Sequence, residues 1–214
     1  MFPQAATGVT LRRHYTYQVC SPTRSALLSG RLPHHVNEGQ SETTHLGGID
    51  LRMETITERL KRGGGWTCAG AGKWHAGGYL AGQTPTARGM DKWLGFLNGK
   101  EDHVTQLTND LGGPKPFPVD LWSSTPVGQG GGNGSGSGSP AFGQNGTYSA
   151  AYISSFLVDA VRAHAARDAA AGQKLFVLAA FQNTHVPLQV PAPRMLIQGG
   201  SRLLMIKIQI IHVF

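Results

Sequence analysis

Apolar residues recur with helical spacing over residues 148–171 and form a continuous run over residues 174–181. The first pattern predicts an amphipathic helix that Gly172 closes, and the second is typical of a buried parallel strand. The expected apolar face of the helix comprises Ile153, Phe156, Leu157, Ala160, Val161 and His164. The strand runs into a polar loop that contains His185. A helix, a buried strand and a polar loop are parts of a βαβ unit, in which functional side chains gather at the carboxyl ends of strands.

A shorter helix is expected immediately after Cys20. Residues 15–19 predict a short strand that delivers Cys20 to a strand-to-helix junction. Ser21 is a good N-cap, Pro22 suits the first helical position and Gly30 supplies the stop. The sequence therefore predicts that Cys20 lies at the N-terminus of a helix.

The position of Cys20 suits the binding of a tetrahedral anion. A side chain at the start of a helix faces unpaired backbone N–H groups and the positive end of the dipole, and Arg24 lies one turn further on. The residues alone leave three possibilities open: a thiolate nucleophile of low pKa, a modified cysteine, or an inert buried thiol. A cysteine phosphatase loop is a poor match, because that loop needs five residues between Cys and Arg and this chain has three.

A second short helix is indicated by a possible capping box of Thr55 and Glu58. Ile56 and Leu60 form its expected apolar face, and the glycines at 63–65 end it. The pattern thus predicts one short amphipathic helix with a defined start and stop.

Residues 66–70 then predict a short strand that leads into Lys73, Trp74 and His75. On an extended segment Lys73 and His75 would point to the same face, while Trp74 would pack the other way. Two polar side chains are therefore expected on one side of this segment.

The chain has 214 residues, which is long enough to bury one well-packed core. The net charge of +7 favours anionic partners, but the basic residues form no tract and no aromatic platform accompanies them, so a nucleic-acid partner is disfavoured. No apolar run reaches the length of a membrane span, and no signal peptide is recognised.

Residues 112–147 are rich in Gly, Ser and Pro and predict a flexible insertion outside the core. Three histidines are expected at the surface: His34, His35 and His45.

Three separated motifs resemble the type I sulfatases. Cys20-x-Pro-x-Arg24, followed by Leu-Leu-Ser-Gly-Arg, is similar to the first signature of that family. Gly-Lys73-Trp-His75-x-Gly resembles the second signature and follows at the family's spacing. Segments 84–102 and 182–191 are similar to arylsulfatase B and its near relatives. The resemblance implies an alkaline-phosphatase-like α/β sandwich with a central mixed sheet.

The resemblance also implies a mechanism. A separate formylglycine-generating enzyme would oxidise Cys20 to formylglycine, whose hydrated gem-diol attacks the sulfur of a sulfate ester. Arg24 would orient that diol, and Lys73 would contact the diol and the sulfate oxygens. His75 would take the proton from the second hydroxyl as sulfate is expelled. His185 would bind sulfate and help to protonate the leaving alcohol.

Calcium is the metal that the resemblance implies, with formylglycine at Cys20 as one ligand. The family's other ligands, an aspartate pair before the cysteine and an Asp-Asn pair well after His185, have no counterpart in this chain. The aspartates present match no ligand motif: Asp50, Asp91, Asp102 and Asp110. Residues 1–192 are therefore interpreted as part of a sulfatase catalytic domain and residues 193–214 as a divergent tail. The isolated chain is expected to be inactive or nearly so.

The sequence thus predicts a sulfuric ester hydrolase that acts on sulfated sugars, polysaccharides or aryl sulfates. The alternative is a catalytically inactive remnant or a pseudoenzyme that binds sulfated glycans. By resemblance, the expected location is the secretory route, lysosomal or extracellular. Asn133 and Asn145 are possible glycosylation acceptors on that route.

Overall fold

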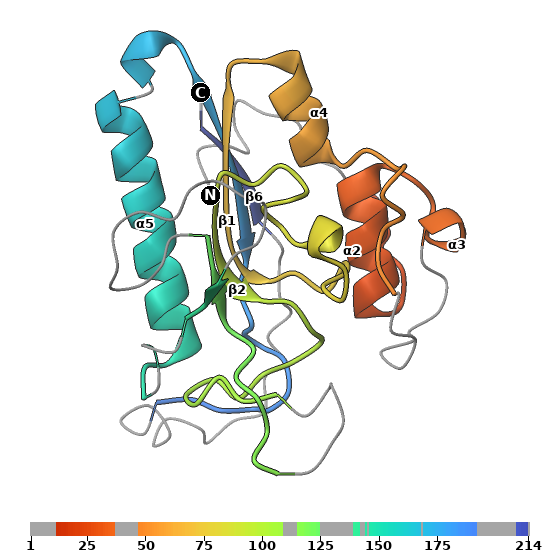
Figure 1. Cartoon of the computed structure of the whole chain (residues 1–214), viewed down its shortest axis with the longest axis vertical. Coiled ribbons are helices and arrows are strands. Elements are labelled where there is room, and N and C mark those ends of the chain that lie inside the picture. The colour runs from red at the N-terminus through yellow and green to blue at the C-terminus, as the bar shows by residue number, and fades with distance from the viewer. Residues whose placement is uncertain are drawn as a thin grey trace.

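The computed structural model describes residues 12–36, 47–108, 115–124, 139–141, 144, 146–167, 169–191 and 209–213. Within these residues a six-stranded sheet lies between helix α5 on one face and helices α2 and α4 on the other (Figure 1). The elements are α2 (Cys20–Ser29), α3 (Pro33–Val36), α4 (Ile56–Gly63), β1 (Trp66–Lys73), η1 (Ala81–Gln83), β2 (Lys92–Phe96), β3 (Trp122–Ser123), β4 (Ser139–Pro140), α5 (Ser149–Arg167), η3 (Ala169–Ala171), β5 (Lys174–Ala180) and β6 (Gln209–Val213).

The sheet is mixed, with the strand order β4-β3-β2-β1-β5-β6. The central strand β1 pairs in parallel with β2 and β5, whereas β3, β4 and β6 join in antiparallel pairs. Because β1, β2 and β5 run the same way, their carboxyl ends meet at one edge of the sheet. This open α/β arrangement confirms the predicted fold class.

Side chains alternate across the sheet to build one apolar layer on each face. On the α5 side the strand residues Ala69 and Val177 pack with Ile153 and Leu157 of the helix. The opposite layer comprises Leu28, Ile49, Cys68, Trp74, Ala76, Met90, Trp93, Leu97, Phe176 and Leu178. Burial of both faces explains why the middle of β1 and most of β5 show no alternation of polar and apolar residues.

Glycine is required where β1 passes between its two neighbours. Gly72 lies opposite Gly95 of β2 and Ala180 of β5. Its φ is +102°, and a Cβ there would lie 1.9 Å from the carbonyl oxygen of Ala180. A Cβ on Gly95 would lie equally close, 1.9 Å, to the carbonyl oxygen of Gly72. The three strands therefore come together at this level only because two of the residues lack side chains.

The segment before Cys20 differs from the prediction. Residues 15–19 form no strand, and Tyr15 and Tyr17 are exposed. Helix α2 begins at Cys20 itself, and its N-cap is Val19 rather than Ser21. Ser21 and Pro22 are instead buried in the first turn, so their side chains serve packing rather than capping. The predicted stop is confirmed, since Gly30 caps the helix in the left-handed conformation at φ 67°.

Helix α4 has the predicted capping box, in which Thr55 and Glu58 hydrogen-bond reciprocally. Its buried face is only partly as predicted. Leu60 packs against the core, but Ile56 is 39 % exposed and Thr57 is fully buried instead. The hydroxyl of Thr57 donates to the carbonyl oxygen of Arg88, which provides the hydrogen bond that a buried threonine needs.

The stretch predicted as an insertion contributes to the sheet. Strands β3 and β4 extend it beyond β2, and Leu121 and Ala141 are buried in the α5 layer. The prediction of an insertion outside the core is therefore wrong for the described residues 121–123 and 139–141. The Gly-, Ser- and Pro-rich composition of the whole stretch obscured the short apolar segment at Leu121 and Trp122. Residues 125–138 lie outside the described residues.

Other predicted segments are close to the observed ones. Strand β1 runs to Lys73, three residues further than expected, and α5 ends at Arg167 with η3 following. In the tail, β6 pairs antiparallel with β5. His34 and His35 are exposed as predicted, and His45 lies outside the described residues. No helix in the described part of the chain combines the length and the hydropathy that crossing a bilayer requires.

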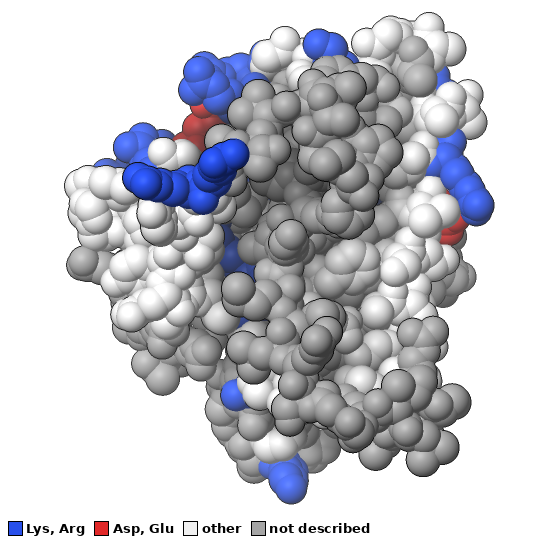
Figure 2. All heavy atoms as spheres, turned by 180° about the vertical axis from the view of Figure 1, so that it is seen from behind, with Lys and Arg blue, Asp and Glu red and all other residues white. Residues whose placement is uncertain are grey.

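Basic side chains lie at separate places on the face in Figure 2 rather than in one tract. Around α4 they are paired with carboxylates. These ion pairs are Lys61 with Asp91 and Arg62 with Glu54, both at the surface. Such pairing reduces the positive potential that the net charge alone would suggest, in agreement with the predicted scattered, mildly basic surface.

Candidate functional site

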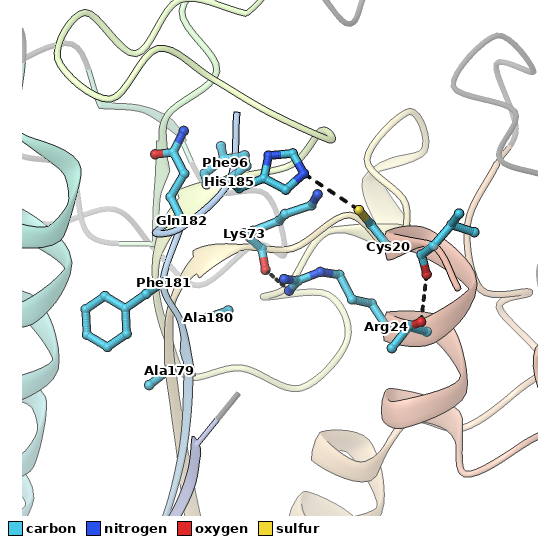
Figure 3. A pocket seen from close by; sticks show the side chains of 11 residues that line it. Cys20, Arg24, Lys73, Phe96, Ala179, Ala180, Phe181, Gln182 and His185 are labelled. Atoms are coloured by element: carbon cyan, nitrogen blue, oxygen red, sulfur yellow. Dashed lines mark hydrogen bonds between the residues drawn. The ribbon is translucent and has the colours of Figure 1, made fainter. Parts of the chain in front are cut away.

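Three segments that are distant in sequence meet at the carboxyl edge of the sheet. They are the first turn of α2, the end of β1 and the loop after β5 (Figure 3). Together they enclose a pocket of about 190 Å³. Its lining residues are Val19, Cys20, Thr23, Arg24, Lys73, Phe96, Ala179, Ala180, Phe181, Gln182 and His185. The pocket thus occupies the position where open α/β sheets bind ligands.

Cys20 is half-buried at the N-terminus of α2, and its Sγ lies 3.9 Å from Nε2 of His185. The pKa of this thiol falls from 9.0 to about 4. Hydrogen bonds from His185 and then His75 contribute most, and the charge of Lys73 adds to them, whereas burial opposes the drop. The sulfur of an unmodified Cys20 is therefore a thiolate at neutral pH, as expected for a position that favours negative charge.

Arg24 lies one turn further along α2 and points back toward the end of β1. Its Nη1 donates to the carbonyl oxygen of Lys73 over 2.7 Å. Burial lowers the pKa of Arg24 to about 10, and the negative charge of Cys20 partly offsets that change. The guanidinium therefore stays charged at neutral pH. Its hydrogen bond links α2 to the end of β1 at the wall of the pocket.

Lys73 and His75 come from the end of β1 and the turn that follows. Lys73 is the last residue of β1 and is only 3 % exposed. The predicted extended segment does not continue to His75, whose φ of 48° turns the chain out of the strand. Both side chains nevertheless approach Cys20, because the turn re-aims His75 toward it. Trp74 packs the other way as predicted and is fully buried.

His185 follows β5, and its two ring nitrogens have different partners. Nδ1 lies 2.9 Å from the carbonyl oxygen of Val186, which can only accept a hydrogen bond. Nδ1 therefore carries a proton, and Nε2 is the nitrogen that faces Cys20 (Figure 3). This arrangement leaves Nε2 available to exchange a proton with whatever occupies the pocket.

The five residues predicted for the site, Cys20, Arg24, Lys73, His75 and His185, therefore come together. Sequence reasoning did not single out Gln182, which lines the pocket and is 2 % exposed. Its position directly after the predicted apolar strand could have indicated Gln182 as a site residue. Figure 3 shows that the side chain of Phe181 points away from Cys20, so this residue shapes the wall without facing the thiol.

The lining of the pocket contains no carboxylate among the described residues. Across the described part of the chain, no three His, Cys, Asp or Glu side chains are arranged to hold a metal ion. Calcium prefers six to eight oxygen ligands, mostly carboxylates and carbonyls. The described residues therefore do not fit a calcium ion at this site.

A second cavity of about 380 Å³ shares the loop that carries His185. Lys100, Glu101, Asp102, Thr105, Leu107, Phe117, Val186 and Pro187 line it. Glu101 is buried, which raises its pKa well above the usual value despite a hydrogen bond from the hydroxyl of Tyr152. The cavity combines apolar walls with charged and polar side chains, and Val186 in its wall directly follows His185 of the first pocket.

The chain matches the family model Sulfatase over residues 3–194. The chain belongs to the sulfatase family. It is 28 % identical to Arylsulfatase J of Mus musculus over 190 residues, which cover 87 % of this chain and 28 % of that protein. It is 33 % identical to N-acetylgalactosamine-6-sulfatase of Homo sapiens over 104 residues, covering 44 % of this chain and 20 % of that protein. This sulfatase chain thus spans a minor part of the length of these relatives.

Solved structures agree with the fold of this sulfatase chain. Ps i-CgsB, solved in complex with k-i-k-neocarrahexaose, has a TM-score of 0.62 and 22 % identity and is matched over 83 % of this chain and 37 % of that one. PsFucS1 sulfatase from Pseudoalteromonas sp. has a TM-score of 0.52 and 19 % identity, over 81 % and 36 % of the two chains. These likenesses support the alkaline-phosphatase-like α/β fold.

Proposed function

We propose that the pocket at Cys20 binds the sulfate group of a sulfate ester and that the whole protein hydrolyses this ester. The observation that carries the proposal is the convergence of Arg24, Lys73, His75 and His185 around one side chain at a helix N-terminus. A thiolate pKa of about 4 shows how strongly this environment favours negative charge. A sulfate group would benefit from the same cations, helix dipole and hydrogen-bond donors.

We assign each side chain a role by its position. Formylglycine formed from Cys20 would supply the nucleophile. Arg24 and Lys73 would stabilise negative charge on the sulfate oxygens, Arg24 from beneath the pocket and Lys73 from the end of β1. His185 would deliver a proton to the leaving alcohol through Nε2, since Nδ1 is held by the Val186 carbonyl. His75 would accept a proton from the group at position 20.

We further propose a sulfated sugar as substrate and an enzyme of the arylsulfatase B type. The segment 182–191 supports the arylsulfatase B type, and the names of relatives such as N-acetylgalactosamine-6-sulfatase support a sugar sulfate. The second cavity offers room for the alcohol part of the ester, and Phe117 supplies an aromatic face there. The proposal also includes the formylglycine-generating enzyme, the secretory route and the division into domain 1–192 and tail 193–214. A calcium ion would need ligands from outside the described residues.

The decisive experiment is hydrolysis of 4-methylumbelliferyl sulfate by chain expressed with a formylglycine-generating enzyme. Peptide mass spectrometry first establishes conversion of Cys20. Turnover that disappears in Cys20→Ala, and persists in a surface control such as Gln173→Glu, would support the proposal. Measurable hydrolysis that is equally fast in the Cys20→Ala variant and in the parent chain would contradict it.

A second function is favoured by the absence of carboxylates from the described pocket lining. The chain would then bind sulfated glycans without turning them over. Binding of a sulfated oligosaccharide that weakens with salt and with Arg24→Ala, but yields no free sulfate, would select this function. Calcium-dependent release of sulfate would reject it.

A further inference from the structure

The loop from Gln182 to Gln189 carries His185 into the pocket, yet few apolar contacts hold it. Val186 and Leu188 are 50 % and 80 % exposed. A loop with little buried apolar surface is free to open locally unless polar contacts restrain it. The position of His185 therefore depends on what fixes the two ends of this loop.

The far end is held through the side-chain amide of Gln189. Its Nε2 donates to Oδ2 of Asp102 over 2.6 Å, and its Oε1 accepts from the backbone N–H of His103 over 2.8 Å. The two partners fix the orientation of the amide, because a carboxylate accepts and an N–H donates. Asp102 is itself oriented, since its Oδ1 accepts from the N–H groups of Val104 and Thr105.

Tyr148 closes the loop by joining its two ends. Its hydroxyl donates to the carbonyl oxygen of Gln189 over 2.8 Å and accepts from Nδ2 of Asn183 over 2.5 Å. The tyrosine ring is held in turn by stacking on His103, with the centroids 5.4 Å apart. At the near end, Gln182 donates to the backbone carbonyl of Glu101.

We propose that Gln189, Asp102 and Tyr148 are positioning residues that hold His185 with Nε2 toward Cys20. None of the three lines the pocket around Cys20, so they act through the loop and not by contact with a ligand. As a statement about catalysis this inference rests on the proposed function. As a statement about geometry it is testable without turnover, because the unmodified thiol of Cys20 senses His185 directly.

The test is the pH dependence of Cys20 alkylation by iodoacetamide in the unmodified full chain. The hydrogen bond from His185 is the largest influence that lowers the pKa of Cys20. The other groups that face the thiol, His75, Lys73 and Arg24, lie on α2 and at the end of β1, outside the loop. Displacement of the loop should therefore raise the midpoint of alkylation, while the remaining groups keep it below 9.0.

The first variant is Gln189→Glu, which removes the amide donor and places a second carboxylate against Asp102. We expect the alkylation midpoint to rise by about one to two pH units, a loss of up to about tenfold in thiolate at pH 5. His185→Ala sets the largest possible shift. Gln173→Glu makes the same charge change at a distant exposed site and should leave the midpoint unchanged.

The second variant combines Asp102→Asn with Gln189→Glu and so exchanges donor and acceptor. The new amide at 102 can donate to the new carboxylate at 189, and its oxygen can still accept from Val104 and Thr105. We expect the double variant to regain the parental midpoint. A role confined to general stability would instead leave the midpoint of the folded Gln189→Glu chain unchanged.

Three results would overturn the inference. The first is an unchanged midpoint in Gln189→Glu when His185→Ala does shift it. The second is a double variant that remains as perturbed as the single one. The third is a Gln189→Glu chain that is unfolded, as shown by labelling of the buried Cys68, and that the double variant does not restore. Failure of sulfate ester hydrolysis alone would leave the inference intact, because the thiol measurement needs no turnover.

Discussion

Replacement of Gly72 by alanine should disrupt the sheet directly beneath the site. The new Cβ would lie 1.9 Å from the carbonyl oxygen of Ala180 and 2.6 Å from its carbonyl carbon. Both atoms belong to the backbone of β5, so no side-chain rotation can relieve the clash. The φ of +102° is also one that alanine rarely adopts.

The expected loss of stability can be built from these two effects. A carbon atom approaches a carbonyl oxygen to about 3.3 Å, so β5 must move away by more than 1 Å. Such a displacement breaks about two ladder hydrogen bonds, each worth about 1 kcal/mol. The strained φ adds about 1–3 kcal/mol. We therefore expect Gly72→Ala to lower the free energy of unfolding by about 4 kcal/mol.

Two other glycines separate the contributions. Gly30 has a φ of +67° but open space around a Cβ, so Gly30→Ala should cost about 1 kcal/mol from backbone strain alone. Gly63 lies within α4, where a Cβ also meets open space, and Gly63→Ala should be neutral or stabilising by up to about 1 kcal/mol. Urea unfolding of the three variants, followed by tryptophan fluorescence, gives the comparison. If Gly72→Ala proves no more destabilising than Gly30→Ala, the close approach of β1 and β5 is wrong.

Three further predictions concern the site and its support. At pH 6 iodoacetamide should label Cys20 in the folded chain and spare Cys68, because Cys68 is fully buried and its burial raises the pKa of its thiol to about 11. Peptide mass spectrometry measures the labelling of both cysteines. A midpoint of Cys20 alkylation near pH 9.0 would contradict the described environment. Since Glu101 has a raised pKa in the folded chain, the unfolded chain ionises first as pH rises above 4.5, and stability should fall by up to about 1.4 kcal/mol per pH unit until the folded pKa is reached. In urea unfolding between pH 5 and 8, Glu101→Gln should lack this decline in stability. If stability changes with pH equally in the variant and the parent chain, the predicted role of Glu101 is wrong. Thr55→Ala removes the cap of α4 and a buried hydroxyl bond, and should lower the free energy of unfolding by about 1–2 kcal/mol, whereas a change below about 0.3 kcal/mol would show that the cap contributes little.

The elements that form the core could be predicted because their signal is carried by apolar residues. The run at 174–181 is strand β5 with little change, and most of the apolar face of 148–171 packs against the sheet. The meeting of the five site residues was expected from motifs rather than derived from periodicity. Their positions are now described, but their roles in catalysis stay predictions.

The features that the sequence did not predict depend mostly on contacts between distant segments. The positive φ of His75 is set by the turn after β1, where the N–H of His75 donates to the carbonyl of Leu97. Helix α2 begins at Cys20, and its first turn buries Ser21, which the local sequence indicated as a cap. The support of His185 by Gln189 and Tyr148 joins residues far apart in sequence, and no local pattern indicates such pairs.

The parallel pairing of β1 has a consequence for the order of folding. Ala69 pairs with Lys92, about twenty residues later, whereas Trp66 pairs with Lys174, more than a hundred residues later. Closing the longer loop costs about 1.4 kcal/mol more in chain entropy, so β1 and β2 should associate before β5 docks. His185 arrives with β5, and until then Cys20 lacks the contact that lowers its pKa most. Pulse alkylation during refolding should therefore find Cys20 changing from slow to fast labelling at pH 6 in the last folding step.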